Sequence, residues 1–352
     1  MKEIFKCAMI IVGTLIGAGF ASGQEIATFF NRFLDYGMWG LILACVLFGI
    51  IIFGVLSLVS KKNILTYDEL IKDNKFFMPI IKLFTFICFC IMISAIGSYG
   101  EEQFGVSFWI GAILSGILCF ILFLFKFSGL EKINNILVPF ILIGTLILGM
   151  AKYDLTDLEL MSGTENYSPF MNTFLMSSIL YAGYNSILLV PILVELKKYN
   201  LKRRDIILLS ILVTLILAVS GILIYRAISV FYPNILFAEL PTLILAKMCG
   251  GFVWKYYSIV ILFAIITTAF SCGYAFLKMN SEKNYFRNAA LMCFAGVLLS
   301  RIGFSQMINI CFPLFGYLGI AQLIMIFLPK KNKEEWFWRR VLFFFCVLLF
   351  WL

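Results

Sequence analysis

Glycines interrupt the first hydrophobic segment of the chain, in the run Gly13-Thr14-Leu15-Ile16-Gly17-Ala18-Gly19-Phe20-Ala21-Ser22-Gly23-Gln24-Glu25. Four glycines within eleven residues weaken an α-helix, because each costs about 1 kcal/mol relative to alanine. In hydrocarbon, an unwound backbone must be buried in protein or line a watery cavity, since lipid cannot satisfy its N–H and C=O groups. We therefore predict that this run is a broken helix that binds a solute.

The composition is that of an all-α integral membrane protein. Of the 352 residues, 62% are hydrophobic and only 13% are charged, which is far from the composition of an ordinary soluble domain. A membrane-spanning helix needs about 20 apolar residues. The sequence predicts about eleven such segments, at 4–30, 37–60, 76–99, 108–127, 133–151, 169–194, 206–230, 252–277, 289–299, 307–328 and 336–352, together with a short surface helix at 238–249.

The basic residues predict the orientation of these segments. With the N-terminus in the cytoplasm, 22 of the 28 lysines and arginines fall on the cytoplasmic side, in accordance with the positive-inside rule. The net charge of +9 thus reflects membrane topology and does not indicate a nucleic-acid partner. We expect a multi-pass protein of the bacterial cytoplasmic membrane, in contact with the lipid bilayer.

The chain also divides into two related halves. A polar stretch at 152–168 separates them, and the first and sixth segments share a local pattern, Ala18-Gly19-Phe20 and Ala182-Gly183-Tyr184. Interrupted segments at corresponding positions of two halves point to an inverted-repeat transporter with its site at the midplane. We predict one transmembrane domain, 1–352, made of inverted repeats at 1–151 and 163–328 with broken first and sixth helices, and a peripheral eleventh helix at 335–352.

A family resemblance accompanies this topology. The run VGTLIGAGFASGQEIATFF, residues 12–30, resembles the opening of the YkvI-type bacterial membrane proteins and, more distantly, of the LeuT-fold amino acid, polyamine and organocation transporter superfamily. The resemblance implies five helices plus five in inverted repeat, with the eleventh helix peripheral. It implies no particular substrate.

A sodium site is expected where the first helix breaks. Carbonyls at the end of its first half can bind a cation, and the eighth segment supplies hydroxyls. Sodium-coupled members of the superfamily hold a cation between first-helix carbonyls and an Ala-x-x-(Thr/Ser)-(Thr/Ser) run on the eighth helix. The resemblance then implies carbonyls and hydroxyls from Gly13, Ile16, Ala264, Thr267 and Thr268. The alternative is that these threonines only hydrogen-bond to carbonyls of their own helix.

The solute is expected beside the same break. A half-helix beginning near Ala21 or Ser22 would present backbone N–H groups to a carboxylate, and four side chains near the two breaks would shape the pocket. The predicted substrate-binding residues are Gly17, Ala18, Gly19, Phe20, Ala21, Ser22, Gly23, Tyr181, Gly183, Tyr184 and Asn185. No acid lies near the second break in the sequence, so we expect an amino acid or similar zwitterionic or neutral solute in preference to a polyamine.

Glu25 is the ionisable residue nearest the first break. An acid inside a membrane segment is a functional candidate, and Glu25 could carry a coupling proton, close a pathway as a gate, or pair with a basic residue. In some superfamily members, a lysine in the middle of the fifth helix takes the place of the cation. Here Lys132 and Lys152 stand only at the ends of that segment, which favours sodium.

These features together predict a secondary active transporter, a sodium-coupled symporter working by alternating access, with sodium as coupling ion and no organic cofactor. Three alternative functions remain: a nutrient-binding receptor or sensor on a transporter fold, a proton-coupled transporter using Glu25, and a passive channel. An enzyme is not expected, because the chain has no histidine and its sequence shows no paired carboxylates or nucleophile constellation.

Overall fold

The computed structural model describes residues 2–71, 77–151, 171–231, 240–280, 284–300 and 311–327. Within these ranges the regular elements are all helices, as predicted. Five of them are long and apolar enough to cross a membrane: α4 (Asp35–Lys62), α6 (Phe77–Phe104), α9 (Phe174–Glu195), α10 (Arg203–Ser229) and α12 (Gly251–Lys278). Shorter apolar helices complete the set: α7 (Phe108–Leu124), α8 (Lys126–Met150), α13 (Tyr285–Leu298) and α15 (Phe312–Phe327).

The first hydrophobic segment is broken, as the glycines predict. It consists of α1 (Lys2–Leu15), α2 (Ala18–Ala21) and α3 (Gln24–Phe29), followed by a short 3₁₀ turn, η1 (Asn31–Phe33). The first interruption is at residues 16–17 and the second at 22–23, where Gly23 has a φ of 77°. A positive φ is a conformation that glycine adopts without steric cost. Gly19, another glycine of the run, lies inside the single turn α2.

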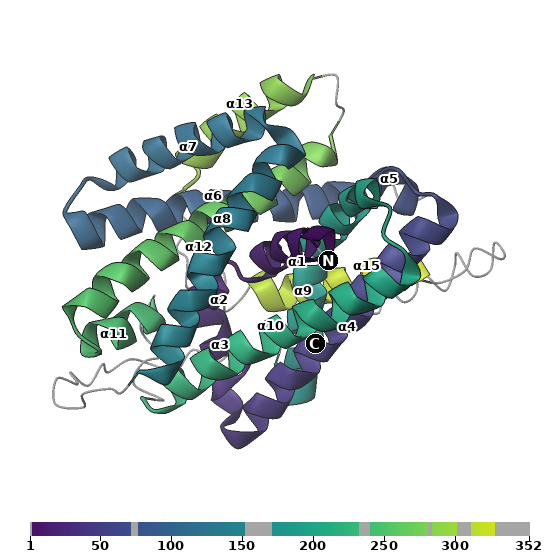
Figure 1. The fold of residues 1–352 in the computed structure, drawn as a ribbon. Coiled ribbons are helices and arrows are strands. Elements are labelled where there is room, and N and C mark those ends of the chain that lie inside the picture. Colours follow the sequence, from purple (N-terminus) through teal and green to yellow (C-terminus); the bar gives the residue numbers. More distant parts are fainter. Residues whose placement is uncertain are drawn as a thin grey trace.

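Most of the helices form two groups. Helix α8 and the broken first segment contact both of them. Helices α1, α4, α9 and α10 contact one another, and α6, α7, α12 and α13 form a second contacting set. Figure 1 shows α6, α7 and α13 together on one side of the molecule and α4, α9 and α10 on the other. Helices α1 and α2 contact α12 of the second set. The broken segment therefore lies at the boundary between the two groups.

The second predicted interruption is absent from α9. This helix runs without a break from Phe174 to Glu195, through the predicted break around Ala182-Gly183-Tyr184 and through Pro191. Gly183 serves close packing instead, because a Cβ at this position would collide with the carbonyl oxygen of Gly316 on α15. Gly319 likewise approaches the Gly183 carbonyl. Small residues let membrane helices approach closely, so this glycine joins α9 to α15.

The remaining elements are short and follow the long helices. They are α5 (Tyr67–Leu70), the 3₁₀ turn η2 (Leu196–Tyr199) and α11 (Pro241–Met248). A short helix was expected at 238–249 on the surface, but α11 buries Pro241, Thr242, Leu243, Leu245 and Ala246. The polar stretch at 152–168, the start of the second repeat at 163 and the eleventh helix at 335–352 lie outside the described residues.

Candidate functional site

The first break contacts the threonine pair of α12 directly. The backbone N–H of Ala18 donates to Oγ1 of Thr268 at 2.9 Å. A Cβ on Gly17 would lie 2.6 Å from that same oxygen, so glycine is needed for the two segments to come this close. The structure therefore brings together the glycine break and Thr268, two features 250 residues apart that the sequence assigned to one site.

Carbonyl groups at the end of α1 are released from the helical ladder. The last backbone bond of α1 runs from the Ile16 N–H to the Val12 carbonyl, and the next one runs from the Ala21 N–H to the Gly17 carbonyl. The carbonyls of residues 13–16 thus accept no i+4 hydrogen bond from the described backbone. Uncapped carbonyls at a helix C-terminus need a partner, and hard cations prefer oxygen ligands of this kind.

The hydroxyls of Thr267 and Thr268 bond within their own helix. Both donate to the carbonyl oxygen of Ala264, at 2.9 Å and 2.8 Å, which is the alternative arrangement expected for membrane threonines. Because their hydrogens point at Ala264, their oxygen lone pairs are turned away from it. The Ala264 carbonyl already accepts both hydroxyls, so it would ligate a cation only if one of them rotated.

Gly13 faces a different helix. A Cβ at Gly13 would lie 2.6 Å from the Val138 side chain and 2.7 Å from that of Asn134, both on α8. The Asn134 amide donates to the Ile10 carbonyl at 3.3 Å. On this side, the glycine allows α1 to pack closely on α8, which holds the end of α1 in place.

Glu25 lies next to α9, the helix in which the second break was predicted. It is in the first turn of α3 and only 5% exposed, and the Tyr181 hydroxyl donates to its Oε2 at 3.0 Å. The Cδ atom of Glu25 would be 2.6 Å from a Cβ on Gly19, so Gly19 leaves room for the carboxyl group. Among the described residues, Glu25 forms no ion pair with lysine or arginine. This corrects the expectation that no acid lies near the second predicted break.

Aromatic rings pack around Tyr181, the hydrogen-bond partner of Glu25, and around Tyr184. Tyr181 packs against Phe29, Phe30 and Phe48 with ring centroids 5.2, 5.1 and 5.7 Å away. Tyr184 stacks on Phe312 at 4.6 Å. The buried Tyr184 hydroxyl interacts electrostatically with Glu25 but makes no hydrogen bond of normal geometry with a described residue. The sequence did not single out the four phenylalanines of this cluster, because the chain has 38 phenylalanines. Phe29 and Phe30 could have been found from their place inside the run 12–30, whereas Phe48 and Phe312 have no such signal.

The second interruption is held by α11 and α12. The carbonyl of Ala21 accepts hydrogen bonds from the hydroxyls of Thr242 and Tyr257, each at 2.8 Å. The Ser22 carbonyl accepts from the Thr242 N–H at 3.0 Å. Thr242 and Tyr257 were not predicted, since only the fold brings them here. The half-helix beyond this joint begins at Gln24, not near Ala21 or Ser22 as expected.

Phe20, Asn185 and Gly183, three further predicted site residues, contact other parts of the protein. Phe20 is buried at 2% exposure. The Asn185 amide donates to the Tyr181 carbonyl of its own helix at 3.0 Å. Gly183 lies at the contact with α15, as described above, and not at an unwound joint.

An ionic cluster ties the start of α1 to the other helices. Glu131 at the start of α8 forms ion pairs with Lys6 of α1 and with Lys198 of η2, the latter at 2.8 Å. The Tyr199 hydroxyl also donates to Glu131, at 2.5 Å. Burial opposes ionisation, but hydrogen bonds from Lys198, Lys6 and Tyr199 outweigh it and lower the pKa of Glu131 to about 2. The carboxylate is therefore charged at neutral pH and holds α1, α8 and η2 together.

Comparison with known proteins agrees with this architecture. No family model matches the sequence. The chain is 25% identical over 351 residues to the uncharacterized membrane protein YkvI of Bacillus subtilis strain 168, which covers 94% of this chain and 97% of that protein. It is also 25% identical over 341 residues to the uncharacterized protein YyaD of the same strain, which covers 93% and 97%.

Two solved transporters share the fold. One is Mhp1, a nucleobase-cation-symport-1 family transporter, in a closed conformation with bromovinylhydantoin bound; the TM-score is 0.63 at 13% identity, covering 92% of this chain and 77% of that one. The other is a Na⁺-coupled sialic acid symporter in a substrate-bound outward-open state, with a TM-score of 0.58 at 14% identity, covering 92% and 79%. Both are transporters and neither is an enzyme. The chain is thus a multi-pass membrane protein with the LeuT-like fold of these two structures, and it is similar to YkvI over nearly its whole length.

Proposed function

We propose that this protein is a secondary active transporter, a sodium-coupled symporter of a small solute that carries a positively charged amino group, such as an amino acid. The observation that carries the proposal is the contact between the helix break at Gly17 and Thr268 of α12. Unwound backbone within a transporter bundle is where substrates and coupling ions bind. The proposal adds the orientation given by the basic residues, with the N-terminus in the cytoplasm of a bacterial cell.

The sodium site would combine the released carbonyls with the threonines of α12. The uncapped carbonyls of Gly13 and Ile16 supply hard oxygen ligands, and the lone pairs of Thr267 and Thr268 supply hydroxyl ligands. The Ala264 carbonyl would join them when a threonine hydroxyl rotates away. No carboxylate is required, because two or more neutral oxygens from each helix can replace the hydration shell of a monovalent ion.

Glu25 supports an amino group on the solute. An ionised carboxylate buried in the membrane domain is costly without a counter-charge, and the described part of the chain gives Glu25 none. The faces of the surrounding aromatic rings attract cations, so an ammonium group would satisfy both the carboxylate and the rings. The same observation favours a second candidate, proton coupling, in which Glu25 takes up a proton in place of a cationic solute.

Two variants separate these possibilities in proteoliposomes. The double variant Thr267→Ala and Thr268→Ala should abolish the sodium dependence of solute uptake, whereas Thr85→Ala should not, because the buried Thr85 hydroxyl also bonds only to carbonyls of its own helix. Glu25→Gln should abolish solute binding if Glu25 receives an ammonium group. If Glu25 carries the proton, this variant should still exchange solute by counterflow but lose pH-driven accumulation.

The same preparation distinguishes a transporter from a receptor. A carrier must show saturable counterflow of labelled solute into liposomes loaded with unlabelled solute, and a receptor must bind solute without it. Binding without counterflow in the wild-type protein would overturn the proposal, and uptake by Thr267→Ala/Thr268→Ala with unchanged sodium dependence would overturn its sodium site.

A further inference from the structure

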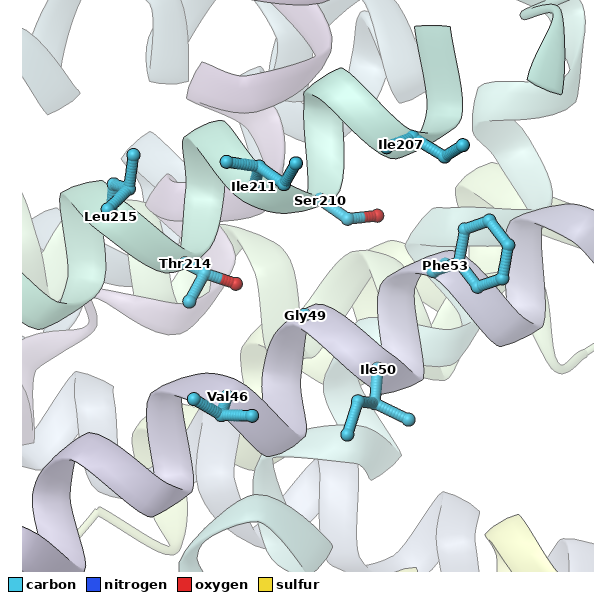
Figure 2. Close-up of a pocket in the computed structure, with 9 residues that line it drawn as sticks. All are labelled: Val46, Gly49, Ile50, Phe53, Ile207, Ser210, Ile211, Thr214 and Leu215. Carbon is cyan, nitrogen blue, oxygen red and sulfur yellow. The ribbon is translucent and has the colours of Figure 1, made fainter. Parts of the chain in front are cut away.

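A lateral groove separates α4 from α10, away from the candidate site. It has a volume of about 450 Å³ and is lined on one side by Val46, Ile50 and Phe53 and on the other by Ile207, Ile211 and Leu215. Figure 2 shows these side chains along the two facing helices. The lining contains no charged residue, so the groove suits an apolar ligand.

Gly49 of α4 lies against Thr214 of α10 in the lining of the groove. Gly49 has no side chain, and a Cβ there would collide with the hydroxyl of Thr214. The Ser210 hydroxyl donates to the Ile206 carbonyl of its own helix at 2.8 Å, so its polarity is satisfied internally. Figure 2 shows Gly49 facing Ser210 and Thr214 across the groove.

The open side of the groove meets the bilayer. Ile50 is 60% exposed, Ile211 is 52% exposed and Leu215 is 57% exposed. Both helices are long enough to cross a membrane, and apolar side chains exposed at this depth contact lipid tails, which are as apolar as leucine. An acyl chain can therefore enter the groove from the side.

One end of the groove is strongly basic. Helix α4 ends in Lys61 and Lys62, and α10 begins after Lys202 with Arg203 and Arg204; all five side chains are exposed. These ends lie on the same side of the protein, because Lys197 Nζ donates to Asn63 Oδ1 at 2.6 Å. The five basic side chains form no ion pair with another described residue.

Helix geometry places these charges at the membrane surface. Gly49 is near the middle of α4, and Lys61 follows it by twelve residues, which is about 18 Å along the helix axis. Half of the hydrocarbon thickness is about 15 Å, so Lys61 reaches the membrane surface. Arg203 and Arg204 precede Ile207 by four and three residues and so lie on the same face of α10. Two nearby acids accept backbone hydrogen bonds: Asp205 accepts from the Lys202 N–H, and Glu69 accepts from the Leu65 N–H.

We propose that this groove binds an anionic phospholipid, with one acyl chain along the groove and the phosphate among the basic residues at its end. Any lipid tail would fit the apolar lining. Only a negatively charged headgroup is favoured by the basic cluster, since each lysine or arginine near a charged membrane surface adds an attraction of its own.

Native mass spectrometry of the full chain tests this site. The protein is purified in detergent and titrated with phosphatidylglycerol or phosphatidylcholine carrying identical acyl chains. Wild-type protein should retain one phosphatidylglycerol in preference to phosphatidylcholine. Arg203→Gln with Arg204→Gln should lower this preference about 30-fold. The matched pair Lys255→Gln with Arg287→Gln, which removes two exposed charges elsewhere, should leave it unchanged.

A second variant tests the groove itself. Ile211→Trp fills it and should lower retention of both lipids, whereas Leu208→Trp, exposed on the same helix but outside the lining, should not. Soluble glycerol 3-phosphate should fail to displace the lipid, because the headgroup alone lacks the acyl chain. The proposal would be overturned if the wild type retained the two lipids equally. It would also be overturned if the Arg203→Gln/Arg204→Gln variant and the Lys255→Gln/Arg287→Gln variant showed the same preference for phosphatidylglycerol.

Discussion

The Tyr181 hydroxyl donates a hydrogen bond of 3.0 Å to Oε2 of Glu25 and so joins the broken first segment to the continuous helix α9. Both side chains are buried, at 2% and 5% exposure. Tyr184, one turn further along α9, offers a second buried hydroxyl to the same carboxyl group without completing a hydrogen bond. The Tyr181 hydroxyl thus fixes the orientation of Glu25, and under the proposed function the Tyr184 hydroxyl would contact the solute.

The two tyrosines give a matched pair of variants. Tyr181→Phe removes a buried hydrogen bond to a carboxyl group, which should lower the free energy of unfolding by about 1.5–3 kcal/mol. Tyr184→Phe removes a hydroxyl that makes no hydrogen bond of normal geometry with a described residue, so stability should change little while solute affinity falls. Thermal unfolding in detergent, with and without solute, measures both effects. Equal destabilisation by the two variants would contradict this assignment of the hydroxyls.

Gly17 should tolerate no side chain. Gly17→Ala places a Cβ 2.6 Å from Oγ1 of Thr268, so the break must move away from α12, and overpacking of this kind costs about 1–3 kcal/mol. Sodium should lose most of its stabilising effect in this variant. The double variant Gly17→Ala with Thr268→Ala should recover stability but not sodium binding. Midpoints of thermal unfolding at a series of sodium concentrations provide the measurement.

Gly183 should behave as a packing residue. Gly183→Ala drives a methyl group into the Gly316 carbonyl on α15 and should destabilise the protein by about 1–3 kcal/mol. Gly100→Ala, in a helix where a Cβ meets nothing within 4 Å, should be neutral or stabilise by up to about 1 kcal/mol. If α9 unwinds at Gly183 during transport, the alanine variant would instead lower the transport rate without lowering stability.

Acid should weaken the cluster at Glu131. Burial acts against its ionisation, but the hydrogen bonds from Lys198, Lys6 and Tyr199 lower the pKa of Glu131 to about 2, below the value of about 4.3 for an unfolded glutamate. The depressed pKa stabilises the folded state above about pH 5, and this stabilisation is lost as the pH falls towards 2.

The Glu131→Gln variant isolates this effect. It should unfold at a lower temperature than the wild type at pH 7, and the gap should narrow as the pH is lowered to about 3. Glu101→Gln, at an exposed position, should show no such trend. A gap that is constant from pH 7 to pH 3 would mean that Glu131 does not stabilise the protein through its charge.

The helical membrane fold and the broken first segment could be predicted because each follows from local physics. Glycine weakens a helix wherever it occurs, and the apolar segments are too long for anything but membrane spans. The continuity of α9 could not be predicted, because Gly183 is equally consistent with unwinding and with close packing. Only the position of Gly316 on α15 decides between them.

The site could be predicted in part for the same reason. The residues of the break and the α12 threonines were identified from their sequence patterns, and the structure brings Gly17 and Thr268 into contact. The pairing of Glu25 with Tyr181 spans 156 residues and has no local signal. The roles of Thr242 and Tyr257 at the second interruption likewise depend on tertiary packing.

Coupling between sodium and solute is tested most directly by thermal unfolding of the purified full chain. Amino acids and other amines are screened in sodium chloride and in potassium chloride of equal concentration, since a ligand that binds the folded state raises the midpoint, and at a fixed concentration the rise is larger for a tighter ligand. At least one amine should stabilise the protein more in sodium, and sodium should bind more tightly when that amine is present, because coupling is reciprocal. An amine that binds equally well in both salts would contradict sodium coupling.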